Sequence, residues 1–102
     1  MNTIIREENN DLVAYFEGRL DTTAASQTAK DVTPLNDCTG HNIILDCTNL
    51  EYISSSGLRI FLNILKKAKP LGSHVYVRGL NDDLREVFKI TGFTNLFEYS
   101  EA

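Results

Sequence analysis

The sequence has few of the residues on which metal centres, disulfide frameworks and redox sites depend. It contains only two cysteines, Cys38 and Cys47, and they form neither a CxxC pair nor a spacing typical of a metal site. We interpret both as reduced thiols, with Cys47 a small apolar residue of a strand. No cluster of His, Cys and Asp has the spacing of a zinc or calcium site, so we expect no bound metal.

Long hydrophobic runs and an excess of basic residues are also absent. No apolar run approaches the ~20 residues that cross a bilayer. Residues 1–5 lead directly into Arg6, Glu7 and Glu8, without a secretory signal. The formal net charge is −4, which disfavours a nucleic-acid partner because phosphate binding requires a basic face. We therefore expect a cytoplasmic monomer that binds neither membranes nor nucleic acids.

One dense basic group remains, formed by Lys66, Lys67 and Lys69 at the end of a predicted helix. Cations there complement the negative end of the helix dipole and stay hydrated. A solvated helix end and a binding patch both fit this pattern, and we favour the solvated helix end.

The sequence signatures of common enzymes are missing. It contains no P-loop, no dinucleotide fingerprint and no Gly-x-Ser-x-Gly elbow. His41 and His74 each begin a predicted strand, outside any recognisable catalytic context, and we interpret both as surface or strand-end residues. We therefore expect a binding protein and not an enzyme.

What the sequence does contain is an alternation of apolar strands and helices in 102 residues, enough for one domain spanning 1–102. We predict strands over residues 3–7, 11–18, 41–47, 74–78 and 97–99. Helices are predicted from 21 to before Pro34, from 57 to 69, and from 82 to a C-terminal cap at Gly92. This order predicts an α/β fold with a mixed, mostly parallel sheet, an antiparallel N-terminal hairpin and packed helices.

The predicted helices differ in the width of their apolar faces. Ala25, Ala29 and Val32 give the first helix a thin stripe. The second helix has a wide stripe that includes Leu58, Ile60, Phe61, Leu62, Ile64, Leu65 and Ala68. A helix this apolar must be covered on most of its circumference, or else part of it is a binding surface.

The most informative segment is Ser54, Ser55, Ser56 and Gly57, which leads into this second helix. Serine is a common N-cap, so the simplest interpretation is that these hydroxyls only satisfy backbone N–H groups. The serines are consecutive, however, and they follow the end of an apolar strand, where binding sites of open α/β sheets lie. Gly57 would also leave room for an approaching partner. A helix N-terminus favours a phosphate, so Ser56 is a candidate phosphorylation switch.

Two aspartates are expected near the same edge. Asp21 stands at the start of the first helix, where capping and partner recognition are both open. Asp46 ends the predicted strand 41–47, and we expect it to orient the serine loop by accepting backbone N–H bonds.

Four segments together resemble a known family: residues 18–21 (Gly-Arg-Leu-Asp), 43–46, 53–58 and 91–93. Over nearly the whole chain they resemble the bacterial anti-sigma factor antagonists, which are single STAS domains. That family typically shows Asp-Ser-Ser-Gly-Leu or Asp-Ser-Thr-Gly-Leu and is phosphorylated on the residue before the glycine, which is Ser56 here. Ser54 stands where the family usually has Asp, so an acidic group that helps to recruit the kinase is missing.

The resemblance implies a function controlled by phosphorylation. The unphosphorylated protein would bind a serine-kinase-type anti-sigma factor and free the sigma factor, and phosphorylation of Ser56 would end the binding. ATP would belong to the kinase, so no cofactor is expected, and a phosphatase would remove the phosphate. The implied partner-binding residues are Asp21, Thr22, Thr23, Ser54, Ser55, Ser56, Gly57 and Leu58.

A different class of function is a ligand-binding or scaffolding STAS module. In that case the helix terminus after Ser56 would recognise a small anion or nucleotide without phosphorylation, and Ser54 in place of Asp keeps this alternative open. Hydrolysis by Ser56 ranks below both because no positioned base accompanies it.

Overall fold

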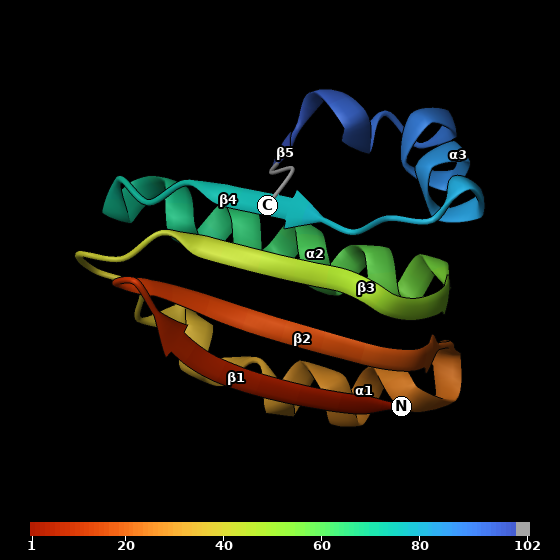
Figure 1. Ribbon diagram of the computed structural model, residues 1–102, viewed down its shortest axis with the longest axis horizontal. Coiled ribbons are helices and arrows are strands. Elements are labelled where there is room, and N and C mark those ends of the chain that lie inside the picture. Colours follow the sequence, from red (N-terminus) through yellow and green to blue (C-terminus); the bar gives the residue numbers. More distant parts are fainter. Residues whose placement is uncertain (100–102) are drawn as a thin grey trace.

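The computed structural model describes residues 1–99, which form a sheet with helices connecting its strands (Figure 1). The strands are β1 (Asn2–Glu8), β2 (Asp11–Leu20), β3 (Ile43–Ile53), β4 (Val75–Arg78) and β5 (Glu98–Tyr99). The helices are α1 (Thr22–Asp31), α2 (Ser55–Ala68) and α3 (Asp82–Ile90). Short 3-10 turns follow α1 at Thr33–Asn36, α2 at Lys69–Leu71 and α3 at Phe93–Asn95.

The sheet has the mixed topology that the sequence predicted. Its order is β1-β2-β3-β4-β5, with β1 and β2 antiparallel and all other neighbours parallel. The hairpin turns at Asn9 and Asn10, whose φ angles of 52° and 69° lie in the left-handed region that asparagine tolerates. The predicted α/β class and the N-terminal hairpin are therefore confirmed.

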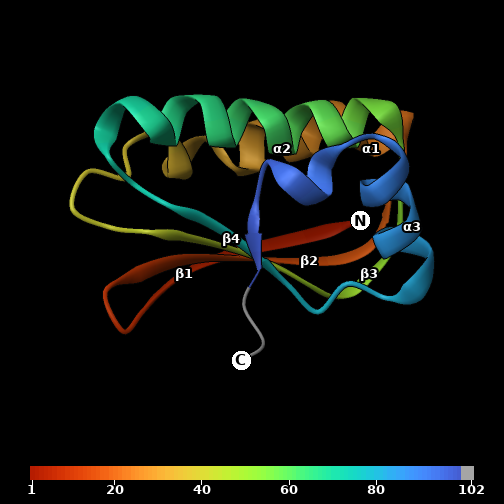
Figure 2. The same ribbon diagram turned by 90° about the horizontal axis from the view of Figure 1, so that it is seen from above.

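The helices are distributed unevenly over the sheet. Figure 2 shows α1 and α2 side by side on one face and α3 at one end. Within residues 1–99, no helix lies over the opposite face. Alternation along β2 places Ala14 and Phe16 in the core beneath the helices, and Tyr15 on the opposite face.

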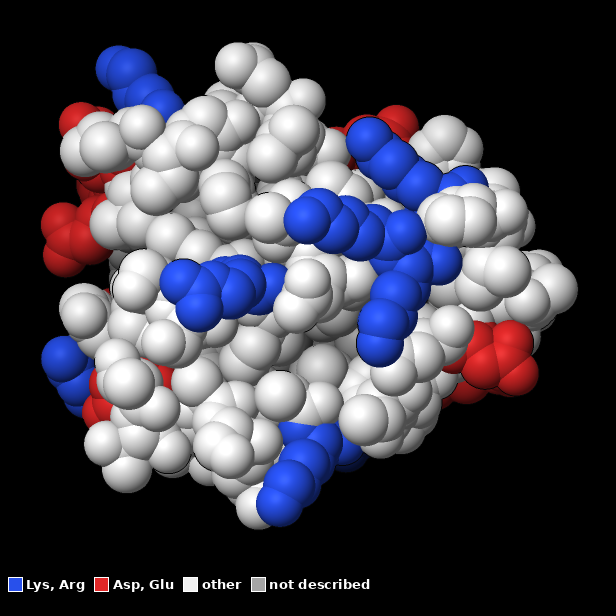
Figure 3. Space-filling model, turned by 180° about the vertical axis from the view of Figure 1, so that it is seen from behind, with Lys and Arg blue, Asp and Glu red and all other residues white. Residues whose placement is uncertain are grey.

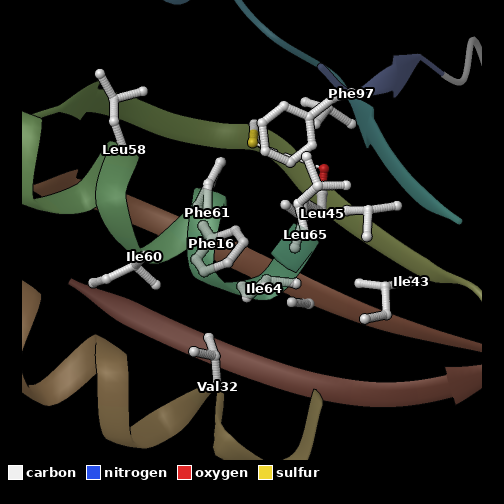
Figure 4. Close-up of a cluster of buried hydrophobic side chains, with 14 of the residues drawn as sticks. Phe16, Val32, Ile43, Leu45, Leu58, Ile60, Phe61, Ile64, Leu65 and Phe97 are labelled. Carbon is white, nitrogen blue, oxygen red and sulfur yellow. Dashed lines mark hydrogen bonds between the residues drawn. The ribbon is translucent and has the colours of Figure 1, made fainter. Parts of the chain in front are cut away.

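α2 supplies the centre of the core (Figure 4). Its buried residues are Gly57, Leu58, Ile60, Phe61, Ile64, Leu65 and Ala68, whereas Leu62 is only partly buried. The Phe61 ring lies 5.1 Å from the ring of Phe16 and 6.2 Å from that of Phe88, between centroids. Full burial of such a side chain contributes about 1.5–3 kcal/mol, so the wide apolar face of α2 serves mainly to hold this helix on the sheet.

Two expectations about individual residues need correction. β3 continues to Ile53, so Asp46 lies in the middle of this strand and not at its end. Register shifts against β2 at two places break the alternation of apolar residues in the second half of β3, which hid the strand. In α1 the buried residues are Ala25, as expected, and Thr28, whereas Ala29 is exposed. Val32 is buried as the C-cap of this helix.

Membrane insertion and metal binding find no support in residues 1–99. None of their helices combines the length and apolarity needed to cross a bilayer. These residues also contain no group of His, Cys, Asp and Glu side chains that could hold a metal ion.

Candidate partner-binding site

Three loops meet at the edge of the sheet where the parallel strands end, and each begins a helix. The capping side chains are Asp21 for α1, Ser54 for α2 and Asn81 for α3. They accept from the N–H groups of Ala24 at 2.8 Å, Gly57 at 3.2 Å and Leu84 at 2.8 Å. Capping was one of the two roles left open for Asp21, and its carboxylate does cap α1. The role of Ser54 shows that the position where the family usually has Asp is the helix cap, a task that serine performs equally well.

The first two loops lie next to each other because of strand pairing. Leu20 pairs with Ile53 in the parallel register, and the N–H of Ser54 donates to the Leu20 carbonyl at 2.8 Å. Asp21 and Ser54 are therefore the next residues in the chain after two paired positions of the sheet. This places the Asp21 loop and the serine loop at one edge, as expected.

The serines of this loop have different environments. Ser54 is only 8% exposed, and its hydroxyl is used by the cap. Ser55 is exposed and Ser56 half-buried in the first turn of α2. The N–H groups of Gly57 and Leu58 are bonded to Ser54, whereas those of Ser55 and Ser56 have no partner in the described part of the chain. An anionic group on Ser56 would therefore find free donors at the positive end of the helix dipole.

A glycine is needed at position 57 for a reason that differs from the one we expected. A Cβ atom there would lie 2.7 Å from Cγ of Leu20 and 2.8 Å from Cγ1 of Ile53. The glycine faces the core, so it lets α2 approach β2 and β3 closely and does not clear space for a partner. The expectation that its missing side chain opens the surface to a partner is wrong.

The predicted binding residues separate into accessible and buried groups. Thr22, Thr23 and Ser55 are exposed, and Asp21 and Ser56 are half-buried. Gly57 and Leu58 are buried, and Leu58 is only 8% exposed. The accessible residues define a polar surface formed by the starts of α1 and α2.

Asp46 does not orient the serine loop. Its carboxylate accepts from Nε of Arg78 at 2.7 Å and from the N–H of Thr48 at 3.0 Å, on the sheet face opposite α1 and α2. Burial by itself would raise the pKa of this carboxyl, but the hydrogen bonds from Arg78 and Thr48 outweigh burial and hold its pKa below the usual value. Arg78 Nη2 also donates to the hydroxyl of Tyr15, which in turn donates to Glu8 at 2.6 Å. Asp46 thus belongs to a polar network that crosses β1, β2, β3 and β4.

The loop after β4 contains a residue that the sequence reading passed over. Gly79 has a φ of 76°, and a Cβ atom there would lie 2.3 Å from Oγ1 of Thr48. A glycine directly after a predicted strand was the available signal. A shallow polar hollow lies nearby, between β2, β3 and the start of α3, and is lined by Glu17, Thr48, Asn49, Leu50, Glu51 and Asn81.

The histidines and cysteines lie away from this edge or inside the fold. His41 lies two residues before the start of β3, and His74 directly precedes β4, both at the opposite end of the sheet. Nδ1 of His41 lies 2.7 Å from the Asn10 carbonyl oxygen, and Nδ1 of His74 lies 2.7 Å from a carboxylate oxygen of Glu98. Both cysteines are buried and unbonded to each other, and burial raises the pKa of the Cys47 thiol.

The outer face of the helices is basic. Figure 3 shows Lys and Arg side chains across this face and acidic side chains towards its rim. Arg59, Lys66 and Lys67 are exposed on α2, which contains no acidic residue. Lys66 and Lys67 occupy the last turn, as predicted for a solvated helix end.

Comparison with known proteins agrees with this architecture. Residues 2–102 match the model of the STAS domain family. The chain is 31% identical over 91 residues to BtrV of Bordetella bronchiseptica, named as an anti-sigma factor antagonist, covering 89% of this chain and 78% of BtrV. It is 27% identical over 85 residues to the anti-sigma-B factor antagonist of Staphylococcus aureus, covering 83% of this chain and 79% of that protein.

Solved structures show the same fold. An anti-sigma factor antagonist domain protein of Planctomyces limnophilus superposes with a TM-score of 0.88 at 16% identity, covering 98% of this chain and 89% of that one. Phosphorylated SpoIIAA of Bacillus superposes with a TM-score of 0.73 at 17% identity, covering 98% and 92%. From the family match, the similarity to BtrV and the shared fold, the chain belongs to the STAS-domain family of anti-sigma factor antagonists.

Proposed function

We propose that this protein is an anti-sigma factor antagonist controlled by phosphorylation of Ser56. In the unphosphorylated state it binds a serine-kinase-type anti-sigma factor and thereby releases the sigma factor. The observation that carries the proposal is the accessible serine at the start of α2, beside the Asp21 loop, in a chain of this family. The name of the Staphylococcus aureus relative gives an anti-sigma factor as the partner of that protein, which supports the proposal.

Ser56 is the proposed acceptor because the alternatives fit less well. The Ser54 hydroxyl is buried and engaged in the helix cap. Ser55 is exposed, but Ser56 is the serine that precedes Gly57, the position that the family resemblance marks. Its half-buried position lies within the turn that has free backbone donors.

Phosphorylation would act mainly by charge. A phosphate adds about −1.5 to −2 charges and bulky anionic oxygens. These would meet an acidic or apolar partner surface unfavourably, and like-charge juxtaposition at an interface costs several kcal/mol. α2 itself has little freedom to move because its apolar side is packed in the core. We therefore expect a local switch and not a rearranged fold.

The remaining roles in the cycle belong to other proteins. The kinase supplies ATP and performs the transfer, and a phosphatase restores the unphosphorylated state. We expect this chain to act as a single monomeric STAS domain over residues 1–102, without catalysis, cofactor or metal of its own. Purified protein alone should therefore show neither hydrolase nor kinase turnover.

The decisive experiment is phosphorylation by a purified serine-kinase anti-sigma factor from the source organism with ATP. Wild-type protein and Ser55→Ala should gain one phosphate, mapped to residue 56, whereas Ser56→Ala should remain unmodified. The phosphorylated protein should no longer displace the sigma factor from the kinase. A phosphate mapped to Ser55, or undiminished displacement by the phosphorylated protein, would contradict the proposal.

A second candidate function is recognition of a small anion or nucleotide by the same helix terminus. The free N–H groups of Ser55 and Ser56, with no carboxylate at position 54, favour it. Calorimetric titration with inorganic phosphate and with ATP tests this candidate. Saturable binding that persists in Ser56→Ala, together with no phosphorylation by any kinase tried, would favour the ligand-binding role.

A further inference from the structure

An arginine and a tyrosine form an exposed stacked pair next to the candidate site. Arg19 of β2 and Tyr52 of β3 are register neighbours in the parallel ladder. The Arg19 guanidinium carbon lies 4.5 Å from the centroid of the Tyr52 ring. Arg19 is exposed, and 41% of the Tyr52 surface is accessible. The pair is thus a fixed feature of the surface that solvent and other proteins can reach.

The Arg19–Tyr52 pair lies directly beside the serine loop. Arg19 directly precedes Leu20, and Tyr52 directly precedes Ile53. Leu20 and Ile53 are buried beneath the first turn of α2, where they contact Gly57. Because side chains alternate along a strand, Arg19 and Tyr52 point to the sheet face opposite the helices. A partner docked on the Asp21 and serine loops would reach the pair by extending over the rim of the sheet.

The guanidinium of Arg19 has no carboxylate partner within the described residues 1–99. The chain has 14 acidic and 10 basic residues, yet no carboxylate in residues 1–99 forms an ion pair with Arg19. Arg78, by contrast, bonds Asp46 at 2.7 Å. A guanidinium stacked on an aromatic ring keeps its N–H donors available in the plane, in a geometry suited to a carboxylate.

The neighbourhood also restricts the kind of anion that fits. Glu17 and Glu51 line the adjoining hollow and are exposed, so acidic residues lie close to Arg19. A nucleic acid or an anionic membrane requires a broad basic field, which this rim does not provide. A single carboxylate presented by a folded protein matches one arginine. Arg and Tyr are also the residue types that most often dominate binding energy in interfaces.

We propose that the Arg19–Tyr52 pair is a second anchor of the partner interface, in which Arg19 binds a carboxylate on the surface of the anti-sigma factor that contacts the serine loop. This inference rests on the proposed function and adds a residue that determines which partner is accepted. Because stacking already restricts the arginine side chain, less conformational entropy is lost when the partner binds.

The test compares matched arginine variants. The probes are the purified serine-kinase anti-sigma factors of the source organism, titrated with wild type, Arg19→Glu, Arg19→Gln and Tyr52→Leu. Arg6→Glu is the control, because Arg6 also lies over a tyrosine, at 5.9 Å from the Tyr15 centroid, but on β1, an edge strand that does not lead into the candidate site. We expect Arg19→Glu to weaken binding by about tenfold or more, and Arg19→Gln and Tyr52→Leu by about three- to tenfold. Arg6→Glu should leave the affinity within about twofold.

The outcomes separate the two proposals. If wild type binds a kinase and is phosphorylated on Ser56, but all Arg19 and Tyr52 variants bind equally well, the second anchor is refuted while the proposed function stands. If wild type binds no kinase of the panel, the proposed function fails and the anchor with it. Melting temperatures identify any variant that has lost its fold. If Arg19→Glu is unfolded, the affinity of Arg19→Gln decides whether the anchor exists, because this variant removes the positive charge without introducing a negative one. Restored affinity when Arg19→Glu meets a partner with one acidic residue changed to Arg would identify the carboxylate.

Discussion

Gly57 packs directly against Leu20, since a Cβ atom on the glycine would lie 2.7 Å from Cγ of the leucine. The first turn of α2 therefore packs on Leu20, the last residue of β2, and the Asp21 loop follows directly after it. The same leucine accepts the hydrogen bond from the Ser54 N–H. The two loops of the candidate site are thus held together by the backbone and core, independently of the polar side chains that a partner would contact.

Gly57→Ala should destabilise the protein by about 1–3 kcal/mol, because the added methyl group overpacks the contact with Leu20 and Ile53. The better helix propensity of alanine, worth about 1 kcal/mol, offsets only part of this. Urea unfolding measures the difference. Asn63→Ala, an exposed change on the same helix, should stay within about 0.5 kcal/mol of wild type. A Gly57→Ala protein as stable as wild type would show that the contact relaxes freely.

Ser54→Ala should lower the free energy of unfolding by about 1 kcal/mol, because it removes the helix cap and leaves the Gly57 N–H without its acceptor. Ser54→Asp should retain the cap and most of the stability, since aspartate caps as well as serine does. Ser55→Ala is the control and should change stability little, because its hydroxyl is exposed. Thermal melting of the three variants compares them, and equal losses for Ser54→Ala and Ser55→Ala would contradict the assigned cap.

Asp21→Asn should separate capping from partner recognition. Asparagine caps a helix about as well as aspartate, so the melting temperature should hardly change. If the carboxylate also contacts the anti-sigma factor, the affinity for it should fall by about tenfold. Titration of the partner together with a melting curve gives both quantities. Unchanged affinity would assign Asp21 to capping alone.

The Asp46–Arg78 pair should give stability a defined dependence on pH. The folded state holds the pKa of Asp46 below its usual value, so its contribution is complete above the unfolded pKa of about 4 and is lost as the pH falls through the folded pKa. Asp46→Asn should lose this dependence and cost about 1–3 kcal/mol at pH 7, because the largely buried Arg78 loses its charged acceptor. Urea unfolding at pH 7 and at pH 3 compares the two proteins. A parallel decline in wild type and variant would show that other carboxylates dominate.

Phosphorylation of Ser56 should change backbone NMR shifts mainly in the serine loop and the first turn of α2. The reason is that the core-facing side of α2 is packed against β2 and β3 and cannot easily move. Ser56→Asp should reproduce these shifts only in part, since it supplies one charge on a shorter side chain. Large shifts in the β1–β2 hairpin and α3 would instead indicate a global rearrangement.

The features that the sequence by itself determined are those with local causes. Apolar periodicity located the wide buried face of α2. Asp21 and Asn81 could be recognised as helix caps because a cap bonds an N–H group three residues away. The Asn9–Asn10 turn likewise depends on neighbouring residues alone. The strand and helix order then led to the mixed sheet through general rules of connection.

Other features depended on residues far apart in the chain, and only the tertiary structure decided them. β3 runs past Asp46 because its irregular second half pairs with β2, and no periodicity marks such a bulged strand. Thr28 is buried in place of Ala29 because the packing of α1 against α2 determines which side of the helix faces inward. Asp46 binds Arg78, which lies 32 residues away, and Arg19 stacks on Tyr52 across the β2–β3 ladder. The energies of such contacts arise only when the sheet has formed, so the sequence could name the residues of the site but not their partners.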